Sequence, residues 1–369
     1  MPVSFAAPGT DGTLVDVDLE IVSAKGITAG DYLGLGAALK GSLSSSDAYV
    51  TIEIDGNLVA WTRPIFDSLE PEWNEKFFFK NVQQNSTFKL TLFDKDIDAD
   101  EKRSSTPSTR FMTRRPHSKS KAGTINITVN QCHKVEADEF AEVQEVGPVR
   151  YSVHSSFTAG LLTMLTSNDA RLESLAYRVQ LHNIPQFLPT DNEWNKNYPT
   201  IQRIFSPDYP ESPVLRQAVM TQHAVIYQHG QERTKYGSVA SPADFFELVH
   251  NGRRNDKPVL FTYAITSKGW YFSETGAAFF KDMLSKHMLH SGAAFSVKYA
   301  GEFHIQQADD DTFKLVIDNN SGTYAPPQEQ LPQLQELMEN NFPGIICEAL
   351  DRDDETLMEA RKEIFAAWE

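Results

Sequence analysis

The chain has 369 residues, of which 40% are hydrophobic, so it is long enough to form two or three domains with buried cores. Its 34 basic and 50 acidic residues give a formal net charge of −16, which argues against a general nucleic-acid-binding protein. The two cysteines, Cys132 and Cys347, are too few for a disulfide framework and fit a reducing compartment.

The first third of the chain alternates apolar and polar residues, which is the pattern of half-buried β-strands. We expect strands at 14–21, 47–55, 57–65, 72–80, 87–94, 122–131 and 147–157. Seven short strands with turn signals between them predict an antiparallel β-sandwich. Residues 102–121 interrupt this rhythm with seven Lys or Arg and no acid. We interpret them as a flexible basic insertion, because this composition buries too little apolar surface to order itself.

Four aspartates follow one of these strands in the stretch "LFDKDIDADE", at positions 94, 96, 98 and 100. At strand-like period two they project to one side, where ionised carboxylates repel one another and raise each other's pKa. A solvated acidic loop is one explanation. The other is a divalent cation, because Ca²⁺ takes six to eight oxygen ligands, largely from carboxylates and carbonyls.

Three stretches occur in a characteristic order, "SDAYVTIEID", "SLEPEWNEKFFF" and "FKLTLFDKDID". Over residues 14–100 this order closely resembles the C2 domain family, and the later strands extend the resemblance to about residue 158. The resemblance implies a calcium- and phospholipid-binding β-sandwich at 10–158. It also implies calcium ligands at Asp47, Asp94 and Asp96, with Asp31 as the first-loop aspartate.

The sequence departs from the family pattern of calcium ligands in two ways. The first loop is long, and Lys102 occupies the place of the family's last aspartate, so Asp98 or Asp100 would substitute for it. A C2-like fold whose acidic loop binds no calcium is the alternative. With calcium bound, the local field at the loops reverses and the metal can accept lipid phosphate oxygens.

Membrane contact is expected from two further groups of residues. The basic insertion and the first loop would meet an anionic phospholipid surface through a set of basic and apolar side chains: Tyr32, Leu33, Leu35, Arg110, Phe111, Met112, Arg114 and Arg115. The alternatives are an insertion without a membrane role and a short helix at 32–39 that covers the sandwich end.

The rest of the chain has a different sequence pattern, with proline-rich stretches and with helical as well as strand-like spacing. Residues 159–222 form a proline-rich connecting region, and 223–369 form an α+β or α/β domain of unknown function. Its end predicts strand 313–318, helix 327–341, strand 345–350 and helix 354–368, a length that suits a parallel crossover. The region resembles uncharacterised regions that accompany C2 domains in fungal or protist proteins, and this resemblance implies no activity.

One stretch of the second domain, "VIDNNSGTYAPP", follows a strand and precedes a helix. Crevices at such places bind ligands in α/β units. The polar residues that would line this crevice are Asp318, Asn319, Ser321, Thr323 and Tyr324. The simpler alternative is turn chemistry, with Pro326 and Pro327 starting the helix. We find no hydrolase, zinc or P-loop motif, and the pairs His223/His229, His287/His290 and Glu302/His304 indicate no specific site.

These features together predict a cytoplasmic, calcium-dependent signalling protein that binds anionic membranes peripherally. The start "MPVSFAAPGTDG" lacks the basic and apolar regions of a secretory signal, and no stretch of 18 apolar residues follows. The second domain would act as an effector or as a binding domain for a protein partner. The alternative is a C2-targeted enzyme acting on a lipid or a membrane-linked substrate, and the absence of catalytic motifs favours the non-enzymatic reading.

Overall fold

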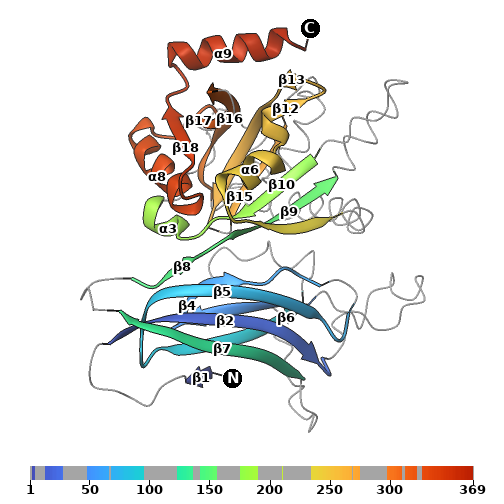
Figure 1. Cartoon of the computed structure of the whole chain (residues 1–369), viewed down its shortest axis with the longest axis vertical. Helices are drawn as coiled ribbons and strands as arrows, with labels where there is room; N and C mark the ends of the chain where they lie inside the picture. Colours follow the sequence, from blue (N-terminus) through green and yellow to red (C-terminus); the bar gives the residue numbers. More distant parts are fainter. Residues whose placement is uncertain are drawn as a thin grey trace, which may run out of the picture. The chain divides into compact units, whose positions relative to one another are not determined.

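The computed structural model describes two compact units, Met1–Gly147 and Pro148–Glu369 (Figure 1). The described residues are 2–4, 13–27, 48–65, 68–94, 123–135, 142–155, 175–189, 210, 234–267, 269–274, 297–309, 312–321 and 326–368. Every structural statement below refers to these residues.

The described part of the N-terminal unit contains two four-stranded antiparallel sheets, with strand orders β1-β6-β3-β4 and β7-β2-β5-β8. The strands are β1 (Pro2–Ser4), β2 (Leu14–Lys25), β3 (Ala48–Ile54), β4 (Asn57–Trp61), β5 (Glu72–Gln83), β6 (Thr87–Asp94), β7 (Thr124–Val135) and β8 (Gln144–Val146). This arrangement confirms the predicted antiparallel β-sandwich. The short strands β1 and β8 were not predicted, because three residues are too few to show a periodicity.

The sandwich core lies between the two sheets and follows the period-two pattern of the sequence. Along β5, buried and exposed residues alternate strictly from Glu72 to Lys80, with Trp73, Phe77 and Phe79 each about 1% exposed. Phe79 meets Phe88 of the other sheet edge to face, with ring centroids 6.0 Å apart. The apolar face of each sheet therefore packs against the other sheet.

The C-terminal unit is built on an eight-stranded sheet of order β11-β9-β10-β15-β14-β16-β17-β18. The strands are β9 (Val149–Ser155), β10 (Leu175–Gln180), β11 (Lys235–Val239), β14 (Leu260–Thr266), β15 (Gly269–Glu274), β16 (Val297–Asp309), β17 (Thr312–Asp318) and β18 (Ile346–Leu350). Neighbouring strands are antiparallel, apart from the parallel pair β17–β18. Strands β12 (Arg253–Arg254) and β13 (Lys257–Pro258) form a separate two-stranded antiparallel sheet.

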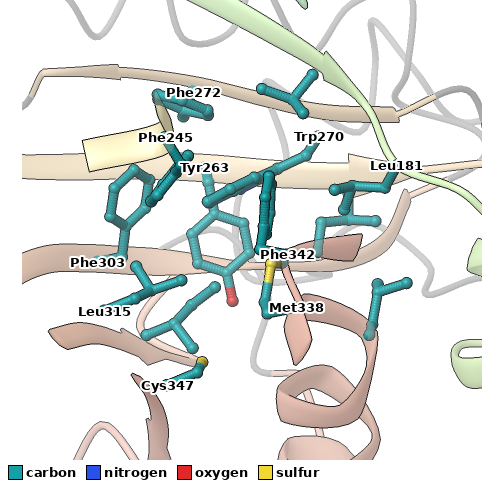
Figure 2. Close-up of a cluster of buried hydrophobic side chains, with 14 of the residues drawn as sticks. Leu181, Phe245, Tyr263, Trp270, Phe272, Phe303, Leu315, Met338, Phe342 and Cys347 are labelled. Carbon is teal, nitrogen blue, oxygen red and sulfur yellow. The ribbon is translucent and has the colours of Figure 1, made fainter. Parts of the chain in front are cut away.

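Helices accompany this sheet: α3 (Ile184–Phe187), α6 (Pro242–Leu248), η2 (His250–Gly252), η3 (Gln328–Gln330), α8 (Leu331–Asn341) and α9 (Glu355–Ala366). One face of the sheet forms an aromatic core with α6 and α8 (Figure 2). Trp270 is fully buried there, with its ring 5.5 Å from Phe245 of α6 and 5.0 Å from Phe303 of β16. Cys347 belongs to the same core, as expected, and burial raises its pKa to about 12.

The end of the chain follows the prediction closely. Strand β17, helix α8, strand β18 and helix α9 appear in that order, and β17 and β18 pair in parallel with Leu315 opposite Cys347. The parallel crossover is thus confirmed, and the second unit is a mixed α+β fold. None of the helices in the described ranges combines the length and the apolar character that a membrane crossing requires.

The boundary between the units differs from the expected one. The sequence placed strand 147–157 in the sandwich and the boundary near residue 158, with a connecting region at 159–222. In the structure the boundary follows Gly147, and β9 lies between β10 and β11 of the second sheet. Val149 of β9 is fully buried in the C-terminal core. The physical reason is that an alternating pattern shows which side of a strand is buried but not which sheet the strand joins.

Candidate functional site

One end of the N-terminal sandwich is fixed by the segment that joins β4 to β5. Ile65 exchanges backbone hydrogen bonds of 2.9 and 3.0 Å with Ala48 at the start of β3, and the carbonyl of Pro71 accepts a 3.0 Å bond from the amide of Ala24 near the end of β2. Six residues reach at most about 20 Å. Since a strand of the length of β2 spans about 40 Å, the end of β2 and the start of β3 lie at the same end of the sandwich.

Strand pairing brings two more strand ends to this place. Ala48 of β3 lies opposite Asp94, the last residue of β6, and Lys25 of β2 lies opposite Thr124, the first residue of β7. We call the end defined by Lys25, Ala48, Asp94 and Thr124 the loop end. The strand ends that flank the connections 28–47 and 95–122 all lie at the loop end. Strand ends that are far apart in the sequence are therefore close together in space.

Two of the predicted calcium ligands are next to this end along the sequence. Asp94 ends β6, and Asp47 directly precedes Ala48. The side chain of Asp94 and the remaining predicted ligands, Asp31, Asp47, Asp96, Asp98 and Asp100, lie outside the described residues, as do the predicted membrane contacts Tyr32, Leu33, Leu35, Arg110, Phe111, Met112, Arg114 and Arg115. Within the described residues, no three His, Cys, Asp or Glu side chains form a group that could hold a metal ion. The calcium site therefore remains a prediction.

The "EPEWNEKFFF" stretch supports the loop end from inside the sandwich. Trp73 is 1% exposed, and its carbonyl accepts a 3.3 Å bond from Nη2 of Arg63. The amide of Arg63 donates to Oε1 of the buried Glu75 at 3.0 Å, and the amide of Val50 donates to Oγ1 of Thr62 at 3.0 Å. These contacts hold residues 62–65 against β3 and β5, so the motif serves the scaffold of the loop end.

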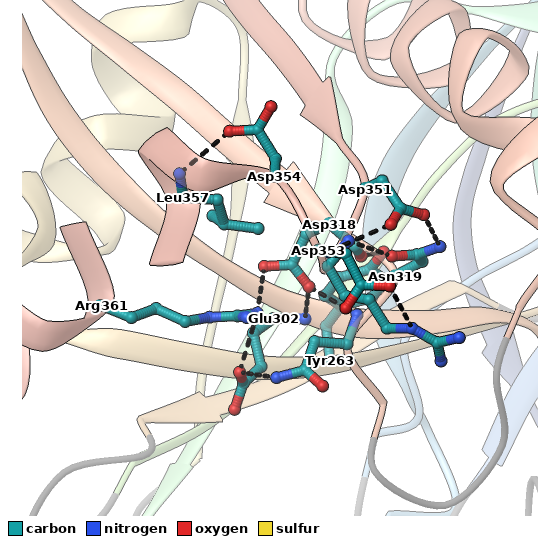
Figure 3. A network of polar contacts seen from close by, with 11 residues as sticks. Tyr263, Glu302, Asp318, Asn319, Asp351, Asp353, Asp354, Leu357 and Arg361 are labelled. Atoms are coloured by element: carbon teal, nitrogen blue, oxygen red, sulfur yellow. Dashed lines mark hydrogen bonds and ion pairs between the residues drawn. The ribbon is translucent and has the colours of Figure 1, made fainter. Parts of the chain in front are cut away.

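The C-terminal unit contains a buried polar network where β16 and β17 meet α9 (Figure 3). Nη2 of Arg361, on α9, lies 2.7 Å from Oδ2 of Asp318 at the end of β17 and 3.1 Å from Oε2 of Glu302 on β16. Asp318 is fully buried and Glu302 is 9% exposed. One guanidinium therefore links two buried carboxylates to the C-terminal helix.

Both oxygens of the Asp318 carboxylate are occupied within the chain. Oδ1 accepts the amides of Glu302 at 2.9 Å and Asn320 at 2.7 Å, while Oδ2 accepts from Arg361. Burial raises the pKa of Asp318 to about 7, although the guanidinium and the two amides act in the opposite direction. Desolvation of the charged form outweighs the favourable contacts, because the group has no access to water.

The backbone carbonyl of Asp318 is held from the other side of the sheet. It accepts a 2.6 Å hydrogen bond from the hydroxyl of Tyr263 on β14. Gly301 of β16 allows this approach, since a Cβ atom at that position would lie 1.9 Å from the carbonyl oxygen. The end of β17 is thus anchored through both its side chain and its main chain.

The neighbouring Asn319 fastens the segments that follow β17 and β18. Its Nδ2 donates to Oδ2 of Asp351 at 2.9 Å and to the carbonyl of Pro326 at 3.3 Å, and its Oδ1 accepts the amide of Arg352 at 2.7 Å. Asn319 is 1% exposed. All three contacts are internal, so this side chain ties together the carboxyl ends of the two parallel strands.

The residues of the predicted crevice therefore divide into two groups. The polar atoms of Asp318 and Asn319 are engaged in the network, which favours the turn-chemistry alternative for them. Ser321 is half-buried, with its amide bonded to the carbonyl of Asn319, while Thr323 and Tyr324 lie outside the described residues. The crevice as a ligand site is untested and remains a prediction.

Arg361 is the network residue that sequence reasoning missed. The sequence does contain a signal that could have found it. Arg361 lies four residues after the buried Leu357 and three before the buried Ile364, on the apolar stripe of α9. A charge on such a stripe needs a buried partner. The sequence does not say which of the many acids supplies it.

His304 lies two residues after Glu302 on the same face of β16. It is 5% exposed, and its Nδ1 has no hydrogen-bond partner. Burial, followed by the charges of Arg361 and Lys314, lowers its pKa to about 4, so the imidazole is neutral near pH 7. The other histidines considered from the sequence, His223, His229, His287 and His290, lie outside the described residues.

The strand order and loop-end geometry of the N-terminal unit agree with a comparison against known families. Residues 16–127 match the model of the C2 domain. The N-terminal unit contains a C2 domain. The match confirms the resemblance drawn from the three sequence stretches, and C2 domains as a family bind membrane lipids.

Among solved structures, the chain is similar to human GIVD cytosolic phospholipase A2. One such structure, in complex with methyl gamma-linolenyl fluorophosphonate and terbium chloride, is 15% identical with a TM-score of 0.23, over 42% of this chain and 22% of the other. A second structure of that protein gives 15% identity and a TM-score of 0.24, over 47% and 26% of the two chains. The chain thus spans about a quarter of that protein's length. Similarity at this level carries no argument about activity.

Proposed function

We propose that the C2 domain binds calcium at the loop end and thereby takes the chain to anionic phospholipid membranes. The observation that supports this proposal is the pairing of Ala48 with Asp94. Asp94 is the last residue of β6, Asp47 directly precedes Ala48 in the sequence, and Asp96 follows two residues after Asp94. Carboxylate oxygens are the ligands that Ca²⁺ prefers, so the residue types fit the metal.

In this proposal Asp47, Asp94 and Asp96 hold the calcium ion, and Asp31 and either Asp98 or Asp100 assist. The bound metal would supply positive charge and open coordination positions for lipid phosphate oxygens. Without it, the aspartates would repel an anionic surface. The basic insertion at 102–121 lies in the connection between β6 and β7, and each Lys or Arg near a negatively charged leaflet adds about 1 kcal/mol of attraction.

Calorimetry on the full chain tests the metal site. We expect Ca²⁺ binding that weakens sharply in the double variant Asp94→Asn with Asp96→Asn. Asp16→Asn with Asp18→Asn is the matched control, because it removes the same charge from β2. Asp18 lies seven residues before Lys25 in this strand, about 23 Å from the loop end. No heat of binding at millimolar Ca²⁺ in the unmutated chain, or equal loss in both variants, would refute the site.

Co-sedimentation with phosphatidylserine vesicles tests the membrane role. Binding should require calcium and should fall in the presence of a chelator. Deleting residues 104–120 should weaken binding at low salt and flatten its salt dependence, because exposed charges are screened over roughly 8 Å at physiological ionic strength. It should leave the calcium requirement intact. Binding that ignores the chelator would instead identify a calcium-independent C2 domain.

For the C-terminal unit we propose a role as an effector or protein-binding domain brought to the membrane by the C2 domain. The internal engagement of Asp318 and Asn319 supports a structural role for the residues that otherwise resemble a ligand crevice. The competing proposal is an enzyme acting on a lipid or membrane-linked substrate. An esterase and phosphatase screen on the full chain distinguishes them, and turnover abolished by Asp318→Asn in a folded variant would establish the enzyme.

A further inference from the structure

Two neighbouring strands of the C-terminal sheet carry arginines on the side away from the aromatic core. On β10, Tyr177 and Val179 belong to the core, so Arg178 between them projects to the opposite side of the sheet. On β9, Val149 belongs to the core, and the next residue, Arg150, projects to the same opposite side. We call the side of β9 and β10 that carries Arg150 and Arg178 the arginine face.

The two arginines are close neighbours on this face. Arg178 lies opposite Ser152, which follows Arg150 by two residues on β9. Diagonal neighbours of this kind are about 7–8 Å apart in the backbone, which is within reach of long side chains. Nε of Arg150 donates to Oε1 of Gln180 at 3.1 Å, and Gln180 is on β10, two residues after Arg178. This bond directs the guanidinium of Arg150 toward the strand that carries Arg178.

The guanidinium of Arg178 lacks a counter-charge among the described residues. Its Nε is buried and has no hydrogen-bond partner there, and its carbon Cζ lies 5.4 Å from the ring centroid of Tyr271 on β15. In the described strands β9, β10, β11 and β15 the single acid is Glu274, which lies opposite the core residue Phe261. A half-buried guanidinium beside a second one is unfavourable unless an anion lies between them.

The buried carboxylates of the polar network do not supply that anion. Glu302 and Asp318 are engaged by Arg361 and belong to β16 and β17. Strands β15 and β14 lie between β10 and β16, so three strand spacings, about 14 Å, separate Arg178 from this network. The contacts of α9 with these carboxylates therefore leave the charge on the arginine face unbalanced.

Hydroxyl groups surround the two arginines. Tyr236 of β11 lies opposite Ser152, Ser152 lies opposite Arg178, and Arg178 lies opposite Tyr271. These four residues form one row across four strands, in which Ser152 is 8% exposed and the other three are half-buried. Hydroxyl groups donate hydrogen bonds to oxyanions, and the planar guanidinium presents paired N–H donors that match the geometry of phosphate oxygens.

We propose that the arginine face binds a phosphate group between Arg150 and Arg178, with hydroxyl donors from the adjoining row. The two positive charges match a phosphate monoester, which carries a charge of about −1.5 to −2 near pH 7. A soluble phosphate monoester and a lipid headgroup both present this group. The site lies in the C-terminal unit, so the proposal does not depend on the calcium site of the C2 domain.

Calorimetry of the full chain with inorganic phosphate, in calcium-free buffer, tests the binding of the free anion. We expect saturable binding that weakens at least about tenfold in Arg178→Gln and in Arg150→Gln, because each loses charge-assisted hydrogen bonds. Arg253→Gln is the matched control, since it removes the same charge from an exposed residue of β12 that bonds to the carbonyl of Asp256. Equal weakening in this control would overturn the proposal.

Co-sedimentation in calcium-free buffer distinguishes the lipid source of the phosphate group. The vesicles are phosphatidylcholine with or without phosphatidic acid. Binding that requires phosphatidic acid, falls in Arg178→Gln and persists in Arg253→Gln assigns the site to a lipid headgroup. Arg178-dependent binding of inorganic phosphate alone assigns it to a soluble phosphate monoester. If neither probe shows binding that depends on Arg178, the proposal is wrong.

Urea unfolding separates a ligand site from a structural role of Arg178. In phosphate-free buffer we expect Arg178→Gln to unfold at nearly the same midpoint as the unmutated chain, because its guanidinium has no partner to lose. Added phosphate should raise the midpoint of the unmutated chain and of Arg253→Gln but not that of Arg178→Gln. A fall in phosphate-free buffer as large as that in Arg361→Met, which breaks an internal ion pair, would show that the chain itself holds Arg178 and would overturn the proposal.

Discussion

The guanidinium of Arg361 contacts two buried carboxylates, those of Asp318 and Glu302. Replacement by methionine keeps much of the length and the apolar contacts of the side chain but removes the guanidinium. Asp318, with no exposed surface, and Glu302, at 9%, then lose this positive charge. Removing one partner of a buried ion pair typically costs about 3–5 kcal/mol. We therefore expect Arg361→Met to lower the free energy of unfolding of the C-terminal unit by about 3–5 kcal/mol.

The loss should also depend on pH in a defined direction. In the unmutated protein the pKa of Asp318 is about 7, and loss of the guanidinium raises it further. Above pH 7 the native variant therefore holds a proton that its unfolded state has lost. The difference in unfolding free energy between wild type and variant should grow by up to about 1.4 kcal/mol for each pH unit above 7.

Urea unfolding of the full chain measures this effect, and hydrogen exchange of peptides from β16 and β17 assigns it to the C-terminal unit. Arg352→Met is the control, because the Arg352 side chain is 41% exposed and its Nε lies 3.8 Å from an Asp353 that is 84% exposed. It should cost at most about 0.5 kcal/mol. Adding Asp318→Asn to Arg361→Met should recover part of the loss. If Arg361→Met were no more destabilising than Arg352→Met, the claim that the Arg361 charge stabilises the buried carboxylates of Asp318 and Glu302 would be wrong.

Three further predictions follow from single contacts. Because the folded-state pKa of Asp318 is raised, its contribution to stability is complete below pH 4 and is lost as pH rises to about 7; Asp318→Asn should remove this slope from the pH dependence of urea unfolding. Asn341→Ala should cost about 1–3 kcal/mol in the same assay, because it removes two buried hydrogen bonds: Oδ1 of Asn341 accepts the amide of His182 at 2.6 Å, and Nδ2 donates to its carbonyl at 3.1 Å. Retained stability would contradict this. Gly301→Ala should abolish soluble folded protein, since its Cβ would lie 1.9 Å from a main-chain oxygen, whereas Gly344→Ala, with open space but φ +86°, should cost only about 1 kcal/mol by thermal melting.

The sequence by itself determined the local structure of much of the chain. Period-two alternation located the main strands of the sandwich, and the order of its motifs identified the C2 domain, which the family match over residues 16–127 confirms. Near the end of the chain, strand, helix, strand and helix appear where helical spacing and turn residues placed them. These signals are local: they depend on which side of an element is buried, and a short window of sequence records that directly.

The tertiary structure alone decided which elements join and where buried charges find partners. The alternation in Val149–Ser155 suited either sheet, and only the packing of Val149 into the C-terminal core assigned it. The sequence predicted Asp318 in a ligand crevice, and that prediction stays untested. Only the structure shows that the amide of Glu302 and the guanidinium of Arg361, from other elements of the chain, hold its carboxylate. A charge needs a partner when buried, but the identity of that partner depends on contacts between distant segments, and no local pattern encodes them.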